Sequence, residues 1–389
     1  MRTFPPGFLW GAATSGHQTE GNNVTSDYWQ REYAPAGTVP EVSGDACDSL
    51  HRYPEDIALL AETGLTSYRF GIEWCRIEPE RGHVSTAMLD HYRRMVDRCH
   101  EHGLTPMVTL NHFTVPRWMD ALGGWRHPHA AEMFARFTEI ALPVVRDGVP
   151  WVCTINEPNI IACREGANLP GVAPVAHGMA RPDQRVSAEL TRAHRMSREV
   201  LTGVPGLRSG WTVATQAIHP LPGCEEQAYA YSRPIEEYFL EAARDDDFVG
   251  VQAYTRTFVG PDGALPPPAG AETTLTGWEY FPDALAIGVR NAWKVTGGVP
   301  VMVTENGIAT ADDDRRIDYT RDALTGLHEA IADGVEVHGY YHWSALDNYE
   351  WGSWAPTFGL IAVDRRTFRR TPRRSARWLG AAARANGLA

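Results

Sequence analysis

The sequence predicts a single-domain (β/α)8 barrel, a TIM barrel, that takes up the whole chain, residues 1–389. Eight short runs rich in β-branched or aromatic residues alternate with longer segments of helical periodicity, which is the pattern of this fold. No linker divides the chain into two cores, and its one biased run, Pro266-Pro267-Pro268, indicates a loop. The rival fold, an open doubly wound sheet, would place a GxGxxG turn after an early strand, and the sequence contains none.

The alternation assigns the elements in chain order. The predicted strands are Phe8–Ala12, Ser67–Ile72, Pro106–Leu110, Trp151–Ile155, Gly210–Ala214, Phe248–Ala253, Val299–Thr304 and Val337–Trp343. The predicted helical stretches between them include Met88–His102, Ala130–Asp147, Ser187–Leu201, Ile235–Ala243 and Asp318–Asp333. Barrel enzymes carry their chemistry where strands end and loops begin, so the residues at these ends are the candidates for function.

Composition excludes several classes of function. A net charge of −12 repels phosphate backbones, so we expect no nucleic-acid partner. No run approaches the roughly 20 apolar residues of a transmembrane helix, and the N-terminus has no signal-peptide core. We therefore expect a cytoplasmic protein with no membrane partner. Six scattered cysteines without a CxxC pair are expected to be reduced and buried.

Basic residues are almost all arginine. The one lysine, Lys294, lies in a helical stretch, which leaves a Schiff-base mechanism without an obvious candidate. The Arg-rich segment from Arg365 to Arg384 is expected to be the solvated face of a closing helix. We expect no metal site and no organic cofactor, and no sequence feature marks an interface between copies of the chain.

Two strand ends each carry a glutamate beside an asparagine. The fourth strand ends in Thr154-Ile155-Asn156-Glu157-Pro158, and the seventh in Val303-Thr304-Glu305-Asn306-Gly307. Strands four and seven face each other across a barrel mouth, so both carboxylates can reach one cavity. Cleavage of a glycosidic bond needs such a pair, in which one group donates a proton and the other attacks or activates water. A structural ion pair is the alternative for either glutamate alone.

Other residues fit a sugar site. Arg69 ends the second strand, where its charge would keep a nearby carboxylate ionised, and Tyr254 follows the sixth strand, where its hydroxyl could bond the same carboxylate. Trp343 and Trp351 flank a polar cluster and are candidates for stacking on a sugar ring.

The motifs resemble glycoside hydrolase family 1, the β-glucosidase and β-galactosidase family, over about the whole chain. The opening segment, residues 8–21, resembles the family's first signature, and the two glutamate motifs match its acid/base and nucleophile motifs. Residues 342–351 resemble its sugar-binding segment, and Phe358-Gly359-Leu360 follows as in the family. Four ordered motifs at this spacing are far more specific than one five-residue match.

The resemblance implies a retaining β-glycosidase without a cofactor, whose partner is a small β-glycoside. In that case Glu157 is the general acid and base, Glu305 is the nucleophile, and Asn156 holds the 2-hydroxyl. Arg69 and Tyr254 would orient Glu305. The remaining family positions would bind the sugar: Gln18, His112 and Glu350 through its hydroxyls, Trp343 beneath the ring, Trp351 through its indole N–H, and Phe113 and Phe358 in the same site.

Several positions depart from the family pattern. Phe113 stands where the family usually has Trp, so one N–H donor to the sugar is lost. Thr114 and Val115 replace Asp-Leu, and Gln252 stands for the usual Asn. The stretch from Gln216 to Asp247 resembles a shortened version of the family's. These changes leave both glutamates intact and bear on which substrate is accepted.

The sequence leaves alternatives open. Glucose, galactose and fucose all fit the pair Gln18 and Glu350, and transfer to an alcohol would use the same glutamates as hydrolysis. Glu350 and the absence of a nearby lysine favour an unphosphorylated sugar. A non-catalytic sugar-binding barrel would require loss of a glutamate. A metal-dependent hydrolase would need histidine ligands at a strand end, whereas His127-Pro128-His129 starts a helix.

Overall fold

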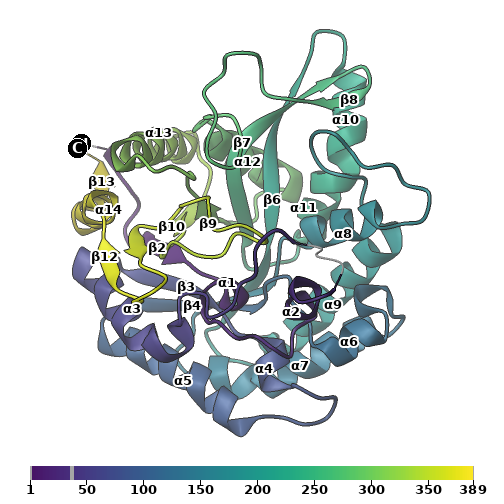
Figure 1. Ribbon diagram of the computed structural model, residues 1–389. Helices are drawn as coiled ribbons and strands as arrows, with labels where there is room; N and C mark the ends of the chain where they lie inside the picture. The colour runs from purple at the N-terminus through teal and green to yellow at the C-terminus, as the bar shows by residue number, and fades with distance from the viewer. Residues whose placement is uncertain (1, 36–38, 389) are drawn as a thin grey trace.

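The computed structural model describes residues 2–35 and 39–388 and forms a closed barrel surrounded by helices (Figure 1). Eight strands pair in parallel around the ring, and the first and last of them pair with each other. They are β2 (Leu9–Ala13), β3 (Ser67–Gly71), β4 (Thr105–Asn111), β5 (Trp151–Asn156), β6 (Arg208–Pro220), β7 (Val249–Gly260), β9 (Val301–Asn306) and β10 (Val337–Trp343). The predicted (β/α)8 fold is confirmed.

The longer helices pack outside the ring and alternate with the strands along the chain (Figure 1). They are α3 (Ser49–Thr63), α5 (Thr86–Glu101), α7 (Ala130–Val145), α8 (Pro158–Ala167), α9 (Gln184–Thr202), α12 (Ala284–Thr296), α13 (Asp313–Ala332) and α14 (Arg374–Ala385). The shorter helices are α1 (Gly16–Thr19), α2 (Asp27–Glu32), α4 (Trp74–Ile77), α6 (Arg117–Ala121), η1 (Gly124–Arg126), α10 (Glu225–Ser232), η2 (Arg233–Glu237) and α11 (Tyr238–Ala242).

Three helices begin earlier than the sequence predicts, because a polar cap starts each of them. The side chains of Ser85, Asp183 and Asp312 accept hydrogen bonds from backbone N–H groups in the first turns of α5, α9 and α13. Apolar periodicity does not extend into these polar first turns, so it places the starts too late. The predicted helix Ile235–Ala243 is a π-helical turn, η2, followed by α11.

Strands β6 and β7 are longer than predicted. Beyond the barrel they continue as a pair, from Ala217 opposite Arg256 to Pro220 opposite Val259, and β8 (Gly263–Leu265) adds an antiparallel strand. This extension projects past the rest of the ring in Figure 1, near the labels β8 and α10. It raises one wall of the barrel mouth.

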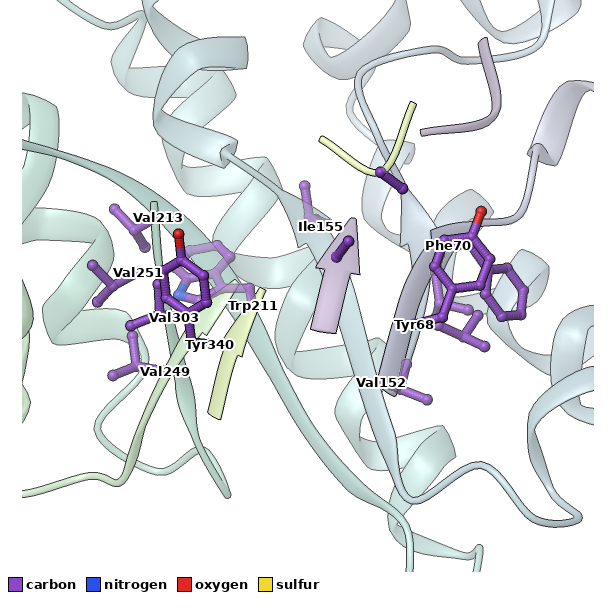
Figure 2. Close-up of a cluster of buried hydrophobic side chains, with 14 of the residues drawn as sticks. Tyr68, Phe70, Val152, Ile155, Trp211, Val213, Val249, Val251, Val303 and Tyr340 are labelled. Atoms are coloured by element: carbon purple, nitrogen blue, oxygen red, sulfur yellow. The ribbon is translucent and has the colours of Figure 1, made fainter. Parts of the chain in front are cut away.

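Side-chain alternation divides the strand residues between two cores. Figure 2 shows buried side chains of the larger core cluster, among them Tyr68 and Phe70, which are two positions apart in β3. Arg69 lies between those two residues and therefore points to the opposite face, into the barrel. A second, smaller cluster that includes Met107, Trp151 and Phe248 fills the barrel interior. Buried polar side chains such as Arg69 can thus lie inside the barrel next to a packed apolar cluster.

The two ends of the described chain meet. Strand β1 (Arg2–Thr3) pairs antiparallel with β13 (Gly387–Leu388), and β11 (Ile361–Val363) pairs with β12 (Arg370–Pro372). The prediction of a solvated arginine face holds only in part, because Arg370 is buried against Asp56 and Arg373 pairs with Asp347. Both arginines precede α14 and join the C-terminal segment to the barrel.

The structure also bears on two predictions made from the composition. All six cysteines are buried and unpaired, as expected, and Lys294 lies in α12. Within residues 2–35 and 39–388, no helix has the length and apolar character needed to cross a lipid bilayer.

Candidate active site

A cavity of about 840 Å³ opens at the carboxyl ends of the barrel strands. Ten of the twelve predicted site residues line it, and the other two, Arg69 and Asn156, are fully buried beside it. The predicted residues in the wall are Gln18, His112, Phe113, Glu157, Tyr254, Glu305, Trp343, Glu350, Trp351 and Phe358. Residues that are 340 positions apart in the chain therefore meet in one site.

Glu305, in β9, is held by two donors on its two oxygens. Arg69 Nη1 donates to Oε1 at 2.7 Å, and the Tyr254 hydroxyl donates to Oε2 at 2.6 Å. Burial raises the pKa of Glu305, and the Arg69 charge and both hydrogen bonds act against that rise. The carboxylate form thus has a fixed orientation and a cationic partner.

Glu157 has the opposite environment. It follows β5 and caps α8, and among the described residues its carboxyl group has no hydrogen bond or ion pair. Burial, followed by the charge of Glu305, raises the pKa of Glu157 from an ordinary value of 4.5 to about 8. At neutral pH this group is mainly a protonated acid. The two carboxyl groups of one cavity thus have different environments.

Asn156 lies at the centre of a buried hydrogen-bond network. Its Oδ1 accepts from Arg69 Nη2 at 2.5 Å, from Gln252 Nε2 at 2.8 Å and from the Thr212 hydroxyl at 3.3 Å. Its amide nitrogen must then be the donor toward His112 Nε2, 3.2 Å away. Gln252, which stands where the family usually has asparagine, supplies one of these three donors.

His112 is held neutral in a defined tautomer. Burial lowers its pKa well below the ordinary value, and the charges of Arg69 and Arg164 act in the same direction. Because Nε2 accepts from Asn156, the proton resides on Nδ1, which has no partner among the described residues. A buried N–H donor without a partner at a cavity wall is suited to a polar ligand.

Glu350 is oriented by two residues that the sequence predicts for sugar binding. The Trp343 indole N–H donates to its Oε1 at 3.1 Å, and Gln18 Nε2 donates to its Oε2 at 3.3 Å. Burial raises its pKa to about 8 against these two bonds. Gln18 is itself fixed by Ser15, which donates to its amide oxygen, and by the Tyr349 carbonyl, which accepts from its nitrogen.

Aromatic rings form one side of the cavity. His112 stacks near Trp343 and Trp351, with ring centroids 5.7 and 6.1 Å apart, and the Phe113 ring meets Trp351 edge-on at 5.0 Å. On the side of Tyr254, Phe358 lies 6.0 Å from the tyrosine ring. Flat apolar faces beside convergent polar groups are typical of carbohydrate sites.

Backbone strain gathers at this cavity. Phe113, Glu157 and Trp351 all have left-handed φ angles, +71°, +45° and +49°, which residues other than glycine rarely adopt. Such conformations persist where the surrounding structure fixes them, and they cluster at functional sites. These three cavity-lining residues lie in the segments that follow β4, β5 and β10.

Some lining residues escape sequence reasoning. Arg256 and Glu279, an ion pair from the extension of β7 and the loop after β8, line the cavity, and so does the half-exposed Trp278. Arg164 reaches the cavity from α8. The signal for Arg164 is its spacing of four residues, about one helical turn, after Ile160, which also lines the cavity from α8. The histidines His127 and His129 do not line the cavity.

Comparison with known proteins places the chain among glycosidases. The model of glycosyl hydrolase family 1 matches residues 1–205 and 243–388. The β-glucosidase A of Thermotoga maritima is 30% identical over 447 residues, covering 100% of this chain and 99% of the relative. The thermostable β-glucosidase B of Thermobispora bispora is 33% identical and covers 99% and 92%. The segment that the family model does not match overlaps residues 216–247, where the sequence resembles a shortened version.

Solved structures agree as well. The crystal structure of β-glycosidase BGL167 superposes with a TM-score of 0.91 at 46% identity, covering 99% of this chain and 98% of that one. A β-glucosidase from Thermotoga maritima in complex with deoxynojirimycin gives a TM-score of 0.91 at 28% identity, with 100% of both chains covered. The resemblance read from the motifs and the expected class of enzyme are both confirmed. The chain is a glycoside hydrolase and belongs to glycosyl hydrolase family 1.

Proposed function

We propose that the protein is a retaining β-glycosidase, most active on β-glucosides, with Glu305 as nucleophile and Glu157 as general acid and base. The carrying observation is the asymmetry of the two carboxyl groups. Glu305 is bonded to Arg69 and Tyr254, whereas Glu157 has no bonded partner among the described residues and has its pKa raised to about 8. A nucleophile must be ionised and an acid must carry its proton at the same pH.

The proposed reaction has two steps. In the first, a Glu305 oxygen attacks the anomeric carbon, the glycosidic C–O bond breaks, and the Glu157 proton moves to the departing oxygen. In the second, Glu157 takes a proton from water, which attacks the anomeric carbon and releases the Glu305 carboxylate. Esterification neutralises Glu305 between the two steps, which lowers the pKa of Glu157 and prepares it as the base.

The ligand is proposed to be an unphosphorylated sugar with hydroxyl groups that face Gln18 and Glu350. A sugar phosphate would need a cationic partner here, and Glu350, whose Oε1 accepts from the Trp343 indole N–H at 3.1 Å, offers none. Glucosides are favoured because both named relatives are β-glucosidases. A 28% identical relative from Bifidobacterium breve is named a bifunctional β-D-glucosidase/β-D-fucosidase, so galactosides and fucosides belong in the same test.

The test is a panel of p-nitrophenyl α- and β-glycosides, run with the wild type and with Glu305→Ala. We expect turnover of a β-glycoside that the variant loses. A 2-deoxy-2-fluoro β-glycoside with a good leaving group should add one sugar mass to the peptide that contains Glu305. Turnover of α-glycosides alone, or label on another residue, would contradict the assignment. Added alcohol acceptors separate transfer from hydrolysis, and binding without any turnover would favour the non-catalytic alternative.

Two broader properties remain proposals. The single domain and the cytoplasmic location are predictions from the sequence. Limited proteolysis with one cooperative unfolding transition tests the former, and fractionation of the source cells tests the latter.

A further inference from the structure

Arg164 stands apart from the other charged residues of the cavity. It lies on α8, where Ile160 and Arg164 line the cavity four residues apart, and Glu157, the residue before the helix, lines it as well. That spacing places Ile160 and Arg164 on one face of the helix, so the guanidinium faces the same cavity as the Glu157 carboxyl group. Arg69 and Arg256, the other arginines at the cavity, are each paired with a carboxylate.

The Arg164 guanidinium has ring contacts but no polar partner. Its carbon lies 4.4 Å from the Phe113 ring centroid and 5.5 Å from that of Trp351, within the range of cation–π contacts. Among the described residues it makes no hydrogen bond and no ion pair, although it is shielded from bulk solvent to the extent that burial lowers its pKa. A guanidinium has five N–H donors, and partly buried donors without acceptors are unfavourable.

The Arg164 guanidinium lies next to Phe113, the residue at which a hydrogen-bond donor of the family is missing. The family usually carries an indole N–H there, and phenylalanine offers none. The guanidinium lies over the rings of that phenylalanine and of Trp351, both of which line the cavity. The N–H donors of Arg164 therefore lie close to Phe113, the position that lacks the indole N–H.

A structural role is the competing explanation. Arg164 lies in the last turn of α8, where a cation interacts favourably with the helix dipole. That role predicts an effect on stability and none on which hydroxyl groups of a substrate matter.

We propose that Arg164 is a specificity-determining residue that donates hydrogen bonds to a hydroxyl oxygen of the bound glycosyl unit, in place of the N–H that Phe113 lacks. The proposal rests on the proposed glycosidase function and deepens it. Charge-assisted hydrogen bonds from a guanidinium fork are strong and directional, so one hydroxyl group should depend on this residue more than the others do.

The experiment measures kcat/KM for p-nitrophenyl β-glucoside and its monodeoxy analogues, lacking the 2-, 3-, 4- or 6-hydroxyl in turn. The enzymes are the wild type, Arg164→Met, Arg164→Lys and Phe113→Trp combined with Arg164→Met. The matched control is Arg208→Met, which removes an exposed guanidinium 4.7 Å from the Trp151 ring, away from the cavity.

We expect Arg164→Met to lower kcat/KM by about 10- to 100-fold on the parent glucoside. In the wild type, kcat/KM should be lower for each deoxy analogue than for the parent glucoside. In Arg164→Met this difference should disappear for one analogue and remain for the other three. Phe113→Trp should restore part of the activity of Arg164→Met. Arg208→Met should match the wild type on every substrate.

Arg164→Lys keeps the helix-end charge, so it separates the two roles even where Arg164→Met folds poorly. It should lower kcat/KM and shrink the same deoxy penalty if the fork binds substrate, and change neither in a structural role. Unchanged deoxy penalties in both variants would overturn the proposal. A wild type with no turnover of any β-glycoside would instead overturn the proposed function on which it rests.

Discussion

The hydroxyl of Tyr254 donates a 2.6 Å hydrogen bond to Oε2 of Glu305, on the oxygen that Arg69 leaves free. Tyr254 is itself positioned through its backbone, whose carbonyl oxygen accepts from the Tyr319 hydroxyl at 2.7 Å. The carboxylate is therefore fixed between a cation from β3 and a phenol from β7. This contact has consequences for both rate and pH dependence.

Tyr254→Phe is expected to lower kcat about 10- to 100-fold, because a hydrogen bond to a charged group is worth roughly 1.5–3 kcal/mol. In the wild type this bond lowers the pKa of Glu305. Its removal should therefore raise that pKa and move the acid limb of the kcat/KM profile to higher pH. Tyr280→Phe is the matched control, since the Tyr280 hydroxyl has no partner among the described residues. An acid limb and kcat unchanged in Tyr254→Phe would contradict the proposed contact.

The basic limb of the pH–rate profile should report Glu157. The acid form is required for leaving-group departure, so kcat/KM should fall as pH rises through about 8. Glu157→Gln is expected to abolish this limb and to lower the rate on an alkyl β-glucoside by about 10²- to 10⁴-fold. A dinitrophenyl leaving group needs little protonation, so the first step should be much less affected. A basic limb retained in Glu157→Gln would assign it to another group.

The strand-end glutamates were predictable because a barrel places the end of every strand at one rim. Glu157 and Glu305 stand at two such ends beside asparagine, and Arg69 alternates with two buried aromatic residues, which turns it inward. Gln18 and Glu350 come from segments outside the strands, and no local pattern marks them. Their assignment needed the family resemblance, which carries information about tertiary arrangement.

Residues brought in by irregular structure were not predictable. Arg256 reaches the cavity because β7 continues beyond the barrel, and Trp278 reaches it from the loop after β8. Polar residues such as Gln216 and Arg256 interrupt the apolar runs of β6 and β7 where the barrel ends, so the predicted strands stop there. Arg164 lies on α8, and its side chain is partly buried because it contacts Phe113 and Trp351, which come from other parts of the chain. In the C-terminal segment, the sequence does not distinguish Arg370 from the surface arginines around it, because its partner Asp56 lies far away in the chain, in α3.

The Arg370–Asp56 pair should carry much of the attachment of the C-terminal segment. Their contact is 2.7 Å long with side chains 0% and 3% exposed, and Arg370 also donates to the Cys47 carbonyl. Arg370→Met leaves Asp56 buried without its cation, which is expected to lower the free energy of unfolding by about 3–5 kcal/mol. Arg374→Met removes an exposed pair with Asp314 and should lower it by less than about 1 kcal/mol. Equal urea midpoints for the two variants would contradict this difference.

Glu157 should also make folding less favourable as pH rises. Its pKa is 4.5 in an ordinary environment and about 8 in the folded protein, so between these values the unfolded chain releases a proton that the folded protein retains. Ionisation then favours the unfolded state, and stability falls by up to about 1.4 kcal/mol for each pH unit across this window. Glu157→Gln cannot ionise. Relative to the wild type, its urea midpoint should therefore match at pH 4 and be increasingly higher from pH 5 to 8. Glu62→Gln, at an exposed position of α3, is the control. A midpoint difference that does not grow with pH would mean that Glu157 is ionised at neutral pH, which would also remove the basis for its role as the acid.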